Sequence, residues 1–554
     1  MISCRYVPTV LLLLLTMIVG HVEAQSFPFH VWHLRVDSSG FGRGIAAGPD
    51  LDGDGRSELL IAAGGGFGAF SLHDGATLTT LYGESGGQTM EAVGLVSRII
   101  HPTLAWLDDL DGDGVDDFAH GYTTFTYSSP VGGPIHRRGF TVRSGATGSP
   151  IWTFLPLGSG GLGVQVRVRA LHDVTGDGVG ELLVEEPLGC RIYDVASQTL
   201  VATLPFASVA PMTDFTSTVN VGGDVDGDGW PDFIMGSGVN GNMGQGGLVE
   251  VRSGDPASGF AVIHALFGAQ GEELGGVNVG ILSDLDGDGH CEFFASRALN
   301  LPNSFFDSAI VVYSGATAQP LFDSETPDFF FGADCRSVPD ITADGVDDFA
   351  VFGSSYPAAT AGELRFYDGA SFSTIRIVEG AADGNYLSQF ESVGDGNGDG
   401  FPEFVFGGAG VSPPGSPTGT PDYGFVWIES LFGSDEYGDP SEHALTLSRQ
   451  PYSNPFLGPL VVGGGTPNGA ISLVASYQPD DFIFPGTTVR VLLDVGAPLA
   501  FILDNLPLDA NGGASFPLDL RNPLLDGTTV YLQAFDLPAG PQSSNAIAIR
   551  FGPQ

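Results

Sequence analysis

The stretch DVDGDGWPDFIMG, from Asp224 to Gly236, has six close copies elsewhere in the chain of 554 residues. Aligned on their first acid, seven copies follow one another at intervals of 51 to 64 residues, beginning at Asp50, Asp109, Asp173, Asp224, Asp284, Asp340 and Asp395. A sequence that recurs at such a period marks a repeat architecture, in which one structural unit is used many times. The sequence therefore predicts seven equivalent units.

The spacing of the acids within a copy indicates a metal-binding loop. In the fullest copies, acids occupy positions one, three, five and nine, and glycines occupy positions four and six. Glycine permits the positive φ values that curl a backbone tightly, so that alternate carboxylates point at one centre. Six or seven oxygen ligands at flexible distances suit Ca²⁺ better than Mg²⁺, which demands a stricter octahedron. The alternative is that these are solvated acidic turns that bind no metal. Seven copies of one ligand pattern disfavour it.

Four copies have an acid at all four positions, and these acids are the first candidate metal ligands. They are Asp50, Asp52, Asp54 and Glu58; Asp109, Asp111, Asp113 and Asp117; Asp224, Asp226, Asp228 and Asp232; and Asp284, Asp286, Asp288 and Glu292. The pattern is not an EF-hand, because position twelve is never acidic and no helices are expected on either side.

Short runs rich in aromatic and β-branched residues surround each acidic loop. DFIMG, EFFAS and EFVFGG follow three of the loops, and further extended runs flank Ser-Gly or Asp-Gly turns, as in GLVEVRSGD and ELRFYDGAS. Four strands in a repeat of this length are typical of a propeller blade, with the acidic loop joining two of the strands. The fold class predicted is all-β: a seven-bladed β-propeller whose apolar positions face the neighbouring blades.

These phrases, with the Phe-Gly openings and the glycine-rich turns after them, resemble FG-GAP repeats over roughly residues 30 to 436. FG-GAP repeats form the blades of integrin α-subunit propellers and of many secreted bacterial proteins. The resemblance implies a seven-bladed propeller with up to seven structural Ca²⁺ ions. When the ligand positions of the repeat are transferred to the other three copies, the resemblance implies these further candidate ligands: Asp173, Thr175, Asp177 and Glu181; Asp340, Thr342, Asp344 and Asp348; and Asp395, Asn397, Asp399 and Glu403.

The two ends of the chain differ from the repeats. Residues 1–24 have a short positive start, an apolar run and a small-residue cleavage pattern before Gln25, which predicts a signal peptide and a secreted or cell-surface protein. The alternative is a retained membrane anchor. Residues 25–436 are assigned to the propeller, and residues 437–554, in which runs such as TTVRVLLDVG alternate with Pro and Gly, to a small β-sandwich. Its role in attachment, export or capping stays open.

A ring of blades needs a closure, since its first and last sheets would otherwise leave open edges. The segment Phe27–Val36 precedes the first acidic loop and has strand character. We expect it to pair in the same blade as Gly424–Gly433.

Composition excludes several classes of function. The formal net charge of −45 disfavours nucleic acids and anionic membranes as partners. All 20 basic residues are arginine, so a Walker A lysine and a Schiff-base lysine are absent. Three cysteines remain after the signal, an odd number that forms no disulfide framework.

The sequence favours a non-catalytic role. HExxH, G-x-S-x-G and Walker motifs are absent, and His73, His120, His172 and His290 stand in different blades, where a surface or turn position is expected. No cluster of acids or histidines is apparent at positions that break the repeat. We therefore expect a calcium-binding extracellular scaffold for adhesion or interaction, whose partner is a protein or a glycan. Alternatives are a propeller enzyme, a lectin for extracellular polysaccharide, or a purely structural part of an envelope.

Overall fold

The structure is a computed structural model, and it describes twenty-eight segments of the chain. These are residues 21–23, 32–36, 41–51, 57–63, 69–73, 80–85, 87–91, 94–127, 135–157, 166–186, 189–206, 216–238, 246–269, 272–301, 304–324, 331–353, 362–379, 385–395, 400–410, 423–431, 433–437, 445–449, 457–476, 479–483, 490–493, 499–519, 529–536 and 542–550.

Antiparallel strands make up nearly all the regular structure of the described residues, beside one 3-10 turn, Pro256–Ser258. Before residue 431 these strands form seven sheets. The first three consist of β3 (Phe41–Ala47), β4 (Leu59–Ala63), β5 (Ala69–His73) and β6 (Thr80–Ser85); β7 (Gly87–Glu91), β8 (Gly94–Leu107), β9 (Asp117–Tyr127), β10 (Ile135–Arg143) and β11 (Pro150–Leu157); and β12 (Val168–Leu171), β13 (Glu181–Glu186), β14 (Gly189–Asp194) and β15 (Thr199–Pro205).

The next three sheets have four strands each, paired in chain order. They consist of β16 (Thr216–Val221), β17 (Phe233–Gly238), β18 (Leu248–Arg252) and β19 (Val262–Phe267); β20 (Glu272–Ile281), β21 (Phe293–Leu301), β22 (Ser304–Tyr313) and β23 (Pro320–Asp323); and β24 (Phe331–Val338), β25 (Asp348–Gly353), β26 (Glu363–Tyr367) and β27 (Thr374–Glu379). The seventh joins both ends of this region: β28 (Asn385–Gly394), β29 (Glu403–Gly410), β30 (Tyr423–Ser430), β2 (Trp32–Val36) and β1 (His21–Glu23).

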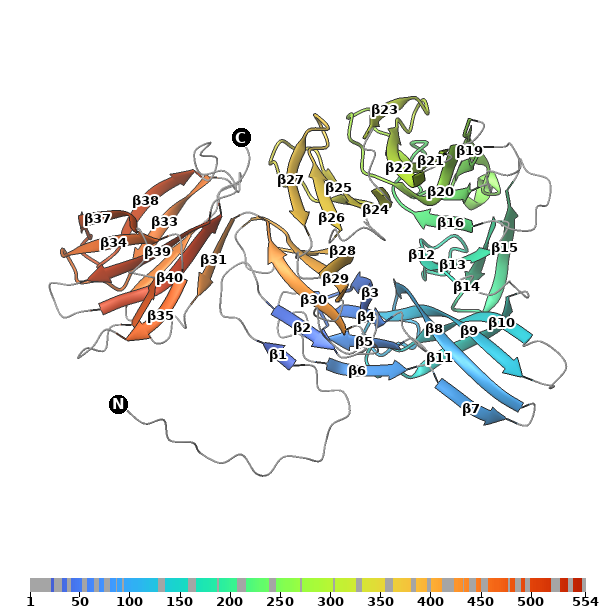
Figure 1. Cartoon of the computed structure of the whole chain (residues 1–554), viewed down its shortest axis with the longest axis horizontal. Helices are drawn as coiled ribbons and strands as arrows, with labels where there is room; N and C mark the ends of the chain where they lie inside the picture. The colour runs from blue at the N-terminus through green and yellow to red at the C-terminus, as the bar shows by residue number, and fades with distance from the viewer. Residues whose placement is uncertain are drawn as a thin grey trace.

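Hydrophobic side chains between neighbouring sheets hold these sheets together in a ring (Figure 1). Phe233 of β17 packs in one cluster with Leu183 of β13, and Phe118 of β9 packs in another with Leu60 of β4. Burial of such side chains stabilises the fold by about 1.5–3 kcal/mol each. Because the two broad faces of each sheet are covered by its neighbours, the chain has the β-propeller fold predicted from its repeats.

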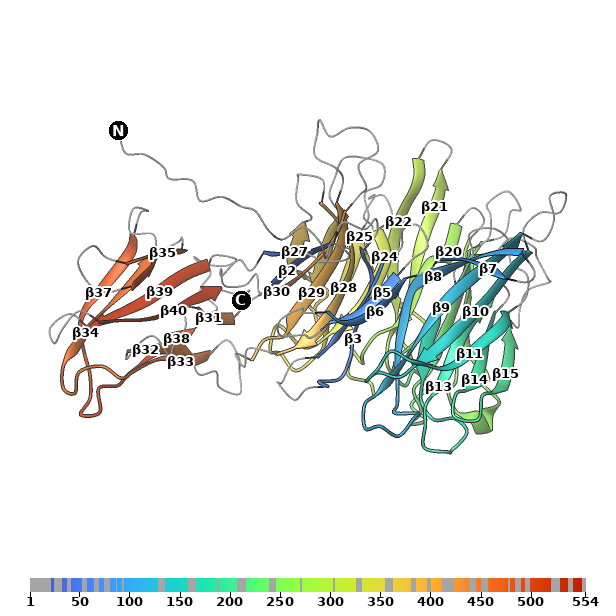
Figure 2. The same cartoon turned by 90° about the horizontal axis from the view of Figure 1, so that it is seen from below.

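The strands of the ring run between two ends, where the turns gather (Figure 2). The strand of each sheet that lies nearest the centre is β3, β8, β12, β16, β20, β24 or β28, and in the third to sixth sheets the last strand lies at the outer edge. β17 is buried along its whole length, whereas β15 and β19 alternate between exposed and half-buried residues. Each acidic loop joins the strand nearest the centre to the next strand of the same sheet, in agreement with the prediction that it joins two strands of a blade.

Residues from Gly433 onward form three further sheets. One has the order β31 (Gly433–Tyr437), β40 (Gln542–Arg550), β39 (Thr529–Asp536), β34 (Ala470–Ser476) and β37 (Leu499–Pro507); another contains β32 (Thr446–Arg449), β33 (Leu457–Gly463) and β38 (Ala514–Asp519); and β35 (Pro479–Ile483) pairs with β36 (Arg490–Leu493). Leu460 of β33 and Ile547 of β40 belong to one buried cluster, so the first two sheets share a core. The division at residues 436 and 437 stays a prediction; β31 lies across it.

Three other features bear on the sequence-based expectations. Cys190, Cys291 and Cys335 are free cysteines, and burial raises the pKa of the Cys190 thiol to about 12. Tyr122 is buried on β9. Within the part of the chain that the structure describes, no helix has the length and apolar character needed to cross a membrane.

The expected closure of the ring is confirmed. β2 pairs antiparallel with β30, with Leu34 opposite Val426 and His33 opposite Trp427. The seventh sheet in turn packs on the first, since Val405 of β29 shares a cluster with Ile61 of β4. β1 lies within the predicted signal peptide, and cleavage after Ala24 would leave a seventh sheet of four strands, like most of the others.

Deleting residues 25–36 should therefore open the ring. The deletion removes β2, leaves the edge of β30 unpaired, and exposes the first and seventh sheets to association with other chains. We expect a lower melting temperature and aggregation in size-exclusion chromatography. A chain beginning at Gln25, which keeps β2, is the matched control. A truncated chain that stays monomeric and melts at the control's temperature would contradict this account of the closure.

Candidate metal-binding loops

The side chain of the first acid organises the loop by accepting hydrogen bonds from backbone N–H groups of the residues that follow it. In the loop after β16, Asp224 Oδ1 accepts the N–H groups of Gly227 at 2.6 Å and Asp228 at 3.1 Å, and Oδ2 accepts that of Gly229 at 2.7 Å. The two glycines have φ values of 75° and 92°, which an L side chain rarely adopts. Asp109 and Asp173 make the corresponding bonds in their own loops, so this fold of the loop repeats.

The acid at position nine fixes the loop to the rest of its blade. Asp232 is fully buried at the start of the second strand, where Oδ2 accepts the N–H of Val225 at 2.7 Å and Oδ1 that of Gly254 at 2.8 Å. Gly254 belongs to the Ser-Gly turn between β18 and β19. A Cβ on Gly254 would lie 1.9 Å from the carbonyl oxygen of Pro231, so only glycine lets the turn approach.

The same arrangement recurs at Asp117 and Asp348. Asp117 accepts from Leu110 at 2.8 Å and Gly145 at 2.9 Å, and Asp348 accepts from Ile341 at 2.7 Å and Gly369 at 2.9 Å. The acid that the sequence assigned to closing a metal shell thus also ties three parts of a blade together.

Burial shifts the titration of these carboxyls upward. Loss of solvation raises the pKa of Asp117 to about 6 and the pKa values of Asp232, Glu292 and Asp348 to about 7, and the neighbouring loop acids raise them further. The backbone N–H bonds act in the opposite direction but are outweighed in all four. At the exposed first position of the third loop, such bonds instead lower the pKa of Asp173.

Carboxylate oxygens converge in the three described loops that have an acid at all four positions. Oxygens of Asp284, Asp286, Asp288 and Glu292 lie within 4.8 Å of one another. In two other loops, three acids each have oxygens equally close to one another. These are Asp109, Asp111 and Asp117 in the second loop, and Asp224, Asp226 and Asp232 in the fourth. An all-oxygen cluster of this kind has the donor set of a hard divalent cation.

Glu292 provides the best evidence that a cation fits. Its Oε2 accepts the N–H of Leu285, whereas Oε1 is buried and has no hydrogen-bond partner among the described residues. A buried carboxylate oxygen without a partner is costly, and a cation among the four acids would supply one. The residues present therefore fit a divalent metal ion.

The remaining candidate ligands lie in less favourable surroundings. In the third and sixth loops a threonine replaces the acid at position three, and neither loop has a comparable cluster. Thr342 Oγ1 lies 3.3 Å from Asp340 Oδ1, to which it donates, and Ala343 has a φ of 56° where the other described loops have glycine. Four candidate ligands lie outside the described residues: Asp52, Asp54, Asn397 and Asp399.

The first and seventh loops are described only in part. Glu58 is buried and its Oε2 accepts the N–H of Leu51 at 2.6 Å, while Asp395 Oδ2 accepts that of Gly400 at 2.8 Å. Glu403 is buried at the start of β29. These contacts match the roles of positions one and nine in the complete loops.

Hydrogen bonds also join neighbouring loops around the ring. Gly180 donates to Asp108 Oδ2 at 2.6 Å, between the third and second blades. His290 Nδ1 lies 2.9 Å from the carbonyl oxygen of Val225, and Ser283 Oγ donates to Asp347 Oδ2 at 2.7 Å. Three pairs of neighbouring loops are therefore linked at one end of the propeller.

Sequence reasoning misplaced some polar residues. His73 and His120 are buried on strands rather than at the surface or in turns, and His120 Nε2 accepts a hydrogen bond from Arg143 Nε at 3.1 Å. A charged cluster at positions that break the repeat does exist, on the inner strands of the ring, and includes Asp334, Arg336 and Glu391. The sequence contained a signal for this cluster. Asp334 and Arg336 lie six and four residues before the first acid of their loop, where the first blade has the small residues Gly44 and Ala46.

Comparisons with known proteins agree with the repeat motif. The model of the FG-GAP repeat matches residues 41–76. No curated protein matches the chain. Among solved structures, the chain is similar to the "beta-propeller domain" of Cps50 (Swd1) from Myceliophteria thermophila, with 10% identity, a TM-score of 0.36, and coverage of 71% of this chain and 97% of that chain. We draw nothing from a likeness of this degree.

The raised pKa values predict that the pH dependence of stability reverses with metal. Without metal, the native protein holds protons on Asp232, Glu292 and Asp348 up to about pH 7, whereas the unfolded chain releases them near pH 4. The free energy of unfolding should therefore fall as pH rises through this window. Bound cations displace the protons, so metal-loaded protein should gain stability over the same window. Thermal melts of dialysed and calcium-saturated protein measure both slopes, and slopes of the same sign would contradict the assignment.

The geometry also predicts the order in which the loops bind metal. The Asp340 loop has one carboxylate fewer than the Asp284 loop, and its left-handed Ala343 costs on the order of 1 kcal/mol. Anomalous diffraction from crystals at graded calcium should therefore show the Asp284 site filled first and the Asp340 site last. The variant Ala343→Gly should fill the Asp340 site at lower calcium. Equal occupancy of the two sites at every concentration would show that ligand charge does not set affinity here.

Proposed function

We propose that this chain, an FG-GAP repeat β-propeller protein, is a secreted calcium-binding scaffold that mediates interactions at or outside the cell surface without catalysis. FG-GAP propellers commonly mediate protein interactions, which supports the scaffold in general. The observation that carries the calcium part is the four-acid cluster at Asp284, in which Glu292 has a buried oxygen without a hydrogen-bond partner among the described residues.

Oxygen-only ligands in a flexible loop favour Ca²⁺ over Mg²⁺ or a transition metal. Asp284, Asp286, Asp288 and Glu292 would hold the ion in the fifth loop, and the corresponding acids would do so in the second and fourth. The ion would neutralise carboxylates that otherwise repel one another. The chain's own residues hold the loop curled through Asp284 and anchor it to the blade through Glu292.

The end of the ring that holds the acidic loops offers an aromatic residue for a partner. Trp230, at position seven of the fourth loop, is 37% exposed, and its ring lies 5.0 Å from that of His172 in the neighbouring blade. Its backbone N–H donates to Asp228 Oδ1 at 2.8 Å, so the metal loop itself fixes the position of the tryptophan. A rigid, partly exposed aromatic side chain is a common anchor in interfaces.

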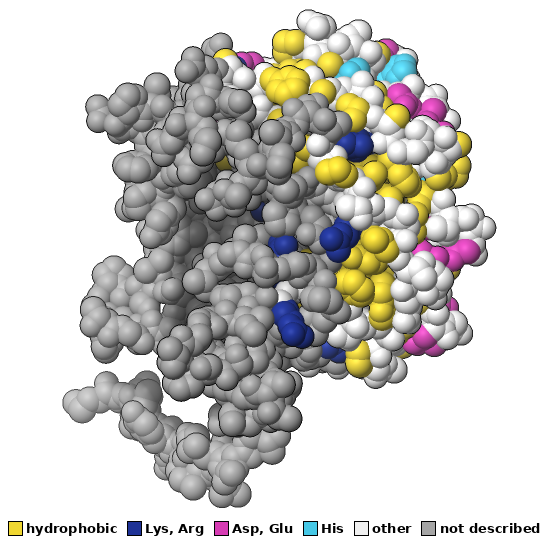
Figure 3. Space-filling model, turned by 90° about the vertical axis from the view of Figure 1, so that its right-hand side faces the viewer, with side chains coloured by type: hydrophobic (Ala, Val, Ile, Leu, Met, Phe, Trp, Pro, Cys, Tyr) yellow, Lys and Arg dark blue, Asp and Glu magenta, His cyan; other side chains and the backbone are white. Residues whose placement is uncertain are grey.

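The sides of the ring are less acidic than the net charge suggests. Leu200 of β15 is 50% exposed and Phe267 of β19 is 64% exposed. Among the described residues in Figure 3, acidic side chains lie mostly toward the right-hand margin, and hydrophobic side chains with a few arginines lie inside that margin. Such a surface supports contact with another macromolecule rather than only with solvent.

Capture of extracellular proteins and a glycan array, each with calcium and with a chelator, tests the proposal. We expect a binding partner that is retained with calcium, is lost on chelation, and binds at least tenfold more weakly to Trp230→Ala. Leu81→Ala, which shortens another exposed hydrophobic side chain away from the fourth loop, is the matched control and should bind normally. Binding that is unaffected by calcium, or turnover of a captured compound, would argue against a calcium-dependent, non-catalytic scaffold.

A further inference from the structure

The inner strands of the propeller surround a cavity of about 410 Å³, within the range of small-molecule sites. β12, β24 and β28 contribute its charged side chains. Arg169, Arg336 and Glu391 each lie four residues before the first acid of the following loop, and Arg167, Asp334 and Gln389 lie six residues before it. Because side chains alternate along a strand, residues at these two positions face the same side, toward the centre of the ring.

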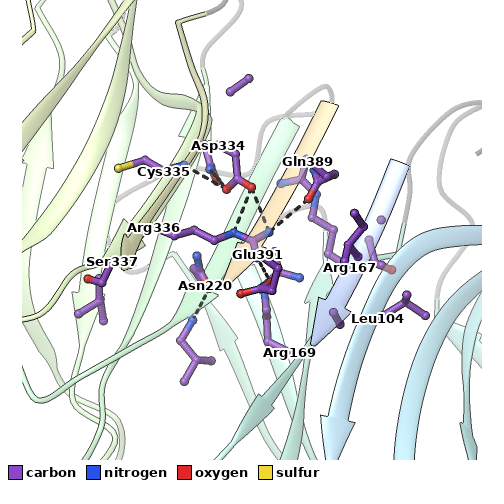
Figure 4. A pocket seen from close by; sticks show the side chains of 18 residues that line it. Leu104, Arg167, Arg169, Asn220, Asp334, Cys335, Arg336, Ser337, Gln389 and Glu391 are labelled. Atoms are coloured by element: carbon purple, nitrogen blue, oxygen red, sulfur yellow. Dashed lines mark hydrogen bonds and ion pairs between the residues drawn. The ribbon is translucent and has the colours of Figure 1, made fainter. Parts of the chain in front are cut away.

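The cavity is unusually rich in arginine for this protein. The chain has 20 arginines and 65 acids, yet three arginines and two acids line the cavity. Figure 4 shows Asp334, Arg336 and Glu391 in contact, with Arg167 and Arg169 nearby. The surroundings at the centre of the ring are therefore basic, in contrast to the acidic loops at its end.

Arg336 is fully engaged by its neighbours. Its Nε lies 3.1 Å from Asp334 Oδ2, one terminal nitrogen donates to Gln389 Oε1 at 3.3 Å, and the other pairs with Glu391. The ring of Phe390 lies 5.8 Å from its guanidinium carbon. Arg336 and its two acids form a structural unit with a net charge of −1.

Arg169 has far fewer partners. A guanidinium has five N–H donors, and among the described residues Arg169 makes a single hydrogen bond, to the carbonyl oxygen of Val168 at 2.9 Å. Burial and the charges of Arg167 and Arg336 lower the pKa of Arg169 to about 10. Arg167 is 3.7 Å from Glu185 Oε2 and a third exposed, so it also retains donors for a further group. On this side of the cavity two arginines thus face one acid, Glu185, which pairs with Arg167 and leaves Arg169 without an acid of its own.

Neutral amides complete the lining. Asn278 Oδ1 accepts the N–H of Val279 at 3.0 Å, and Asn220 Oδ1 accepts that of Val221 at 2.9 Å. Asn278 Nδ2 also donates to Asp334 Oδ1 at 3.4 Å, and Asn220 Nδ2 to the carbonyl oxygen of Val279 at 3.5 Å. An amide has two N–H donors, so each asparagine retains one for a further group. A dianion would meet repulsion from Asp334 and Glu391, whereas a carboxylate matches the bidentate geometry of a guanidinium.

We propose that the central cavity binds a small hydroxylated carboxylate, of the sugar-acid class, with Arg169 as its bidentate partner and Arg167 as a second cation. The carboxylate supplies the acceptors that Arg169 lacks, and the amides of Asn220, Asn278 and Gln389 bond its hydroxyl groups. This site is distinct from the acidic loops and from the partner surface around Trp230.

Calorimetric titration of the calcium-saturated full chain tests the site. D-Glucuronate is the probe, and D-glucose is the neutral control of similar size. Inorganic phosphate and sulfate test whether other anions bind. We expect D-glucuronate to bind, D-glucose not to bind, and Arg169→Gln to weaken D-glucuronate at least tenfold. Arg169→Lys should bind with intermediate affinity. Arg297→Gln, which removes an arginine paired with Asp323 outside the cavity, should bind like the unaltered protein.

Melting temperatures of the variants separate binding from folding. Arg169→Gln should melt no lower than the unaltered protein, because Arg169 has no acid of its own. Arg336→Gln should melt lower, because it leaves the buried Asp334 and the partly buried Glu391 without their cation. Failure of D-glucuronate to bind, or equal binding by Arg169→Gln, would overturn the proposal. Phosphate or sulfate binding as tightly as D-glucuronate would assign the cavity to inorganic anions instead. None of these outcomes depends on the calcium-dependent partner.

Discussion

The buried carboxylate at the start of the second strand of each blade is the constraint on which the rest of the structure depends. In the fourth blade, Asp232 joins the acidic loop at Val225 to the Ser-Gly turn at Gly254, so one side chain ties three segments of the blade together. Because such a group is costly to bury as an anion, it must hold a proton or face a cation. The acids at positions one, three and five bring their own charges to the same place, which makes a cation the better solution at neutral pH.

The hydrogen bonds between loops extend this constraint from one blade to its neighbours. Contacts such as Gly180 with Asp108, and His290 with Val225, place these loops against the loops of adjacent blades. The hydrophobic clusters between sheets and the pairing of β2 with β30 then close the ring. Metal binding in one loop would therefore also stabilise the packing of the next blade, with no change of fold.

Sequence reasoning identified the fold and the loops because both depend on local patterns. The period of the acidic phrase, the positive-φ glycines and the strand-like runs are all local, and so was the hint that Phe27–Val36 returns to the last blade. The buried histidines could not be found in this way, and the charged residues of the inner strands appear in the sequence only as departures from the repeat, not as a cavity. His120 is buried because Arg143 and the neighbouring sheets surround it, and Arg169 meets Arg336 only because the third and sixth blades face the same centre. Such contacts join residues far apart in the chain.

Counting the calcium ions bound by the protein tests the central claim most directly. Equilibrium dialysis of the folded chain, after exhaustive removal of metal, gives this number at saturation. The account predicts at least three ions per chain, in the loops at Asp109, Asp224 and Asp284, and up to seven at high calcium. If the variant Glu292→Gln binds one calcium ion fewer than the unaltered protein, that ion belongs to the fifth loop. A chain that stays folded and binds no calcium at any concentration would contradict the account.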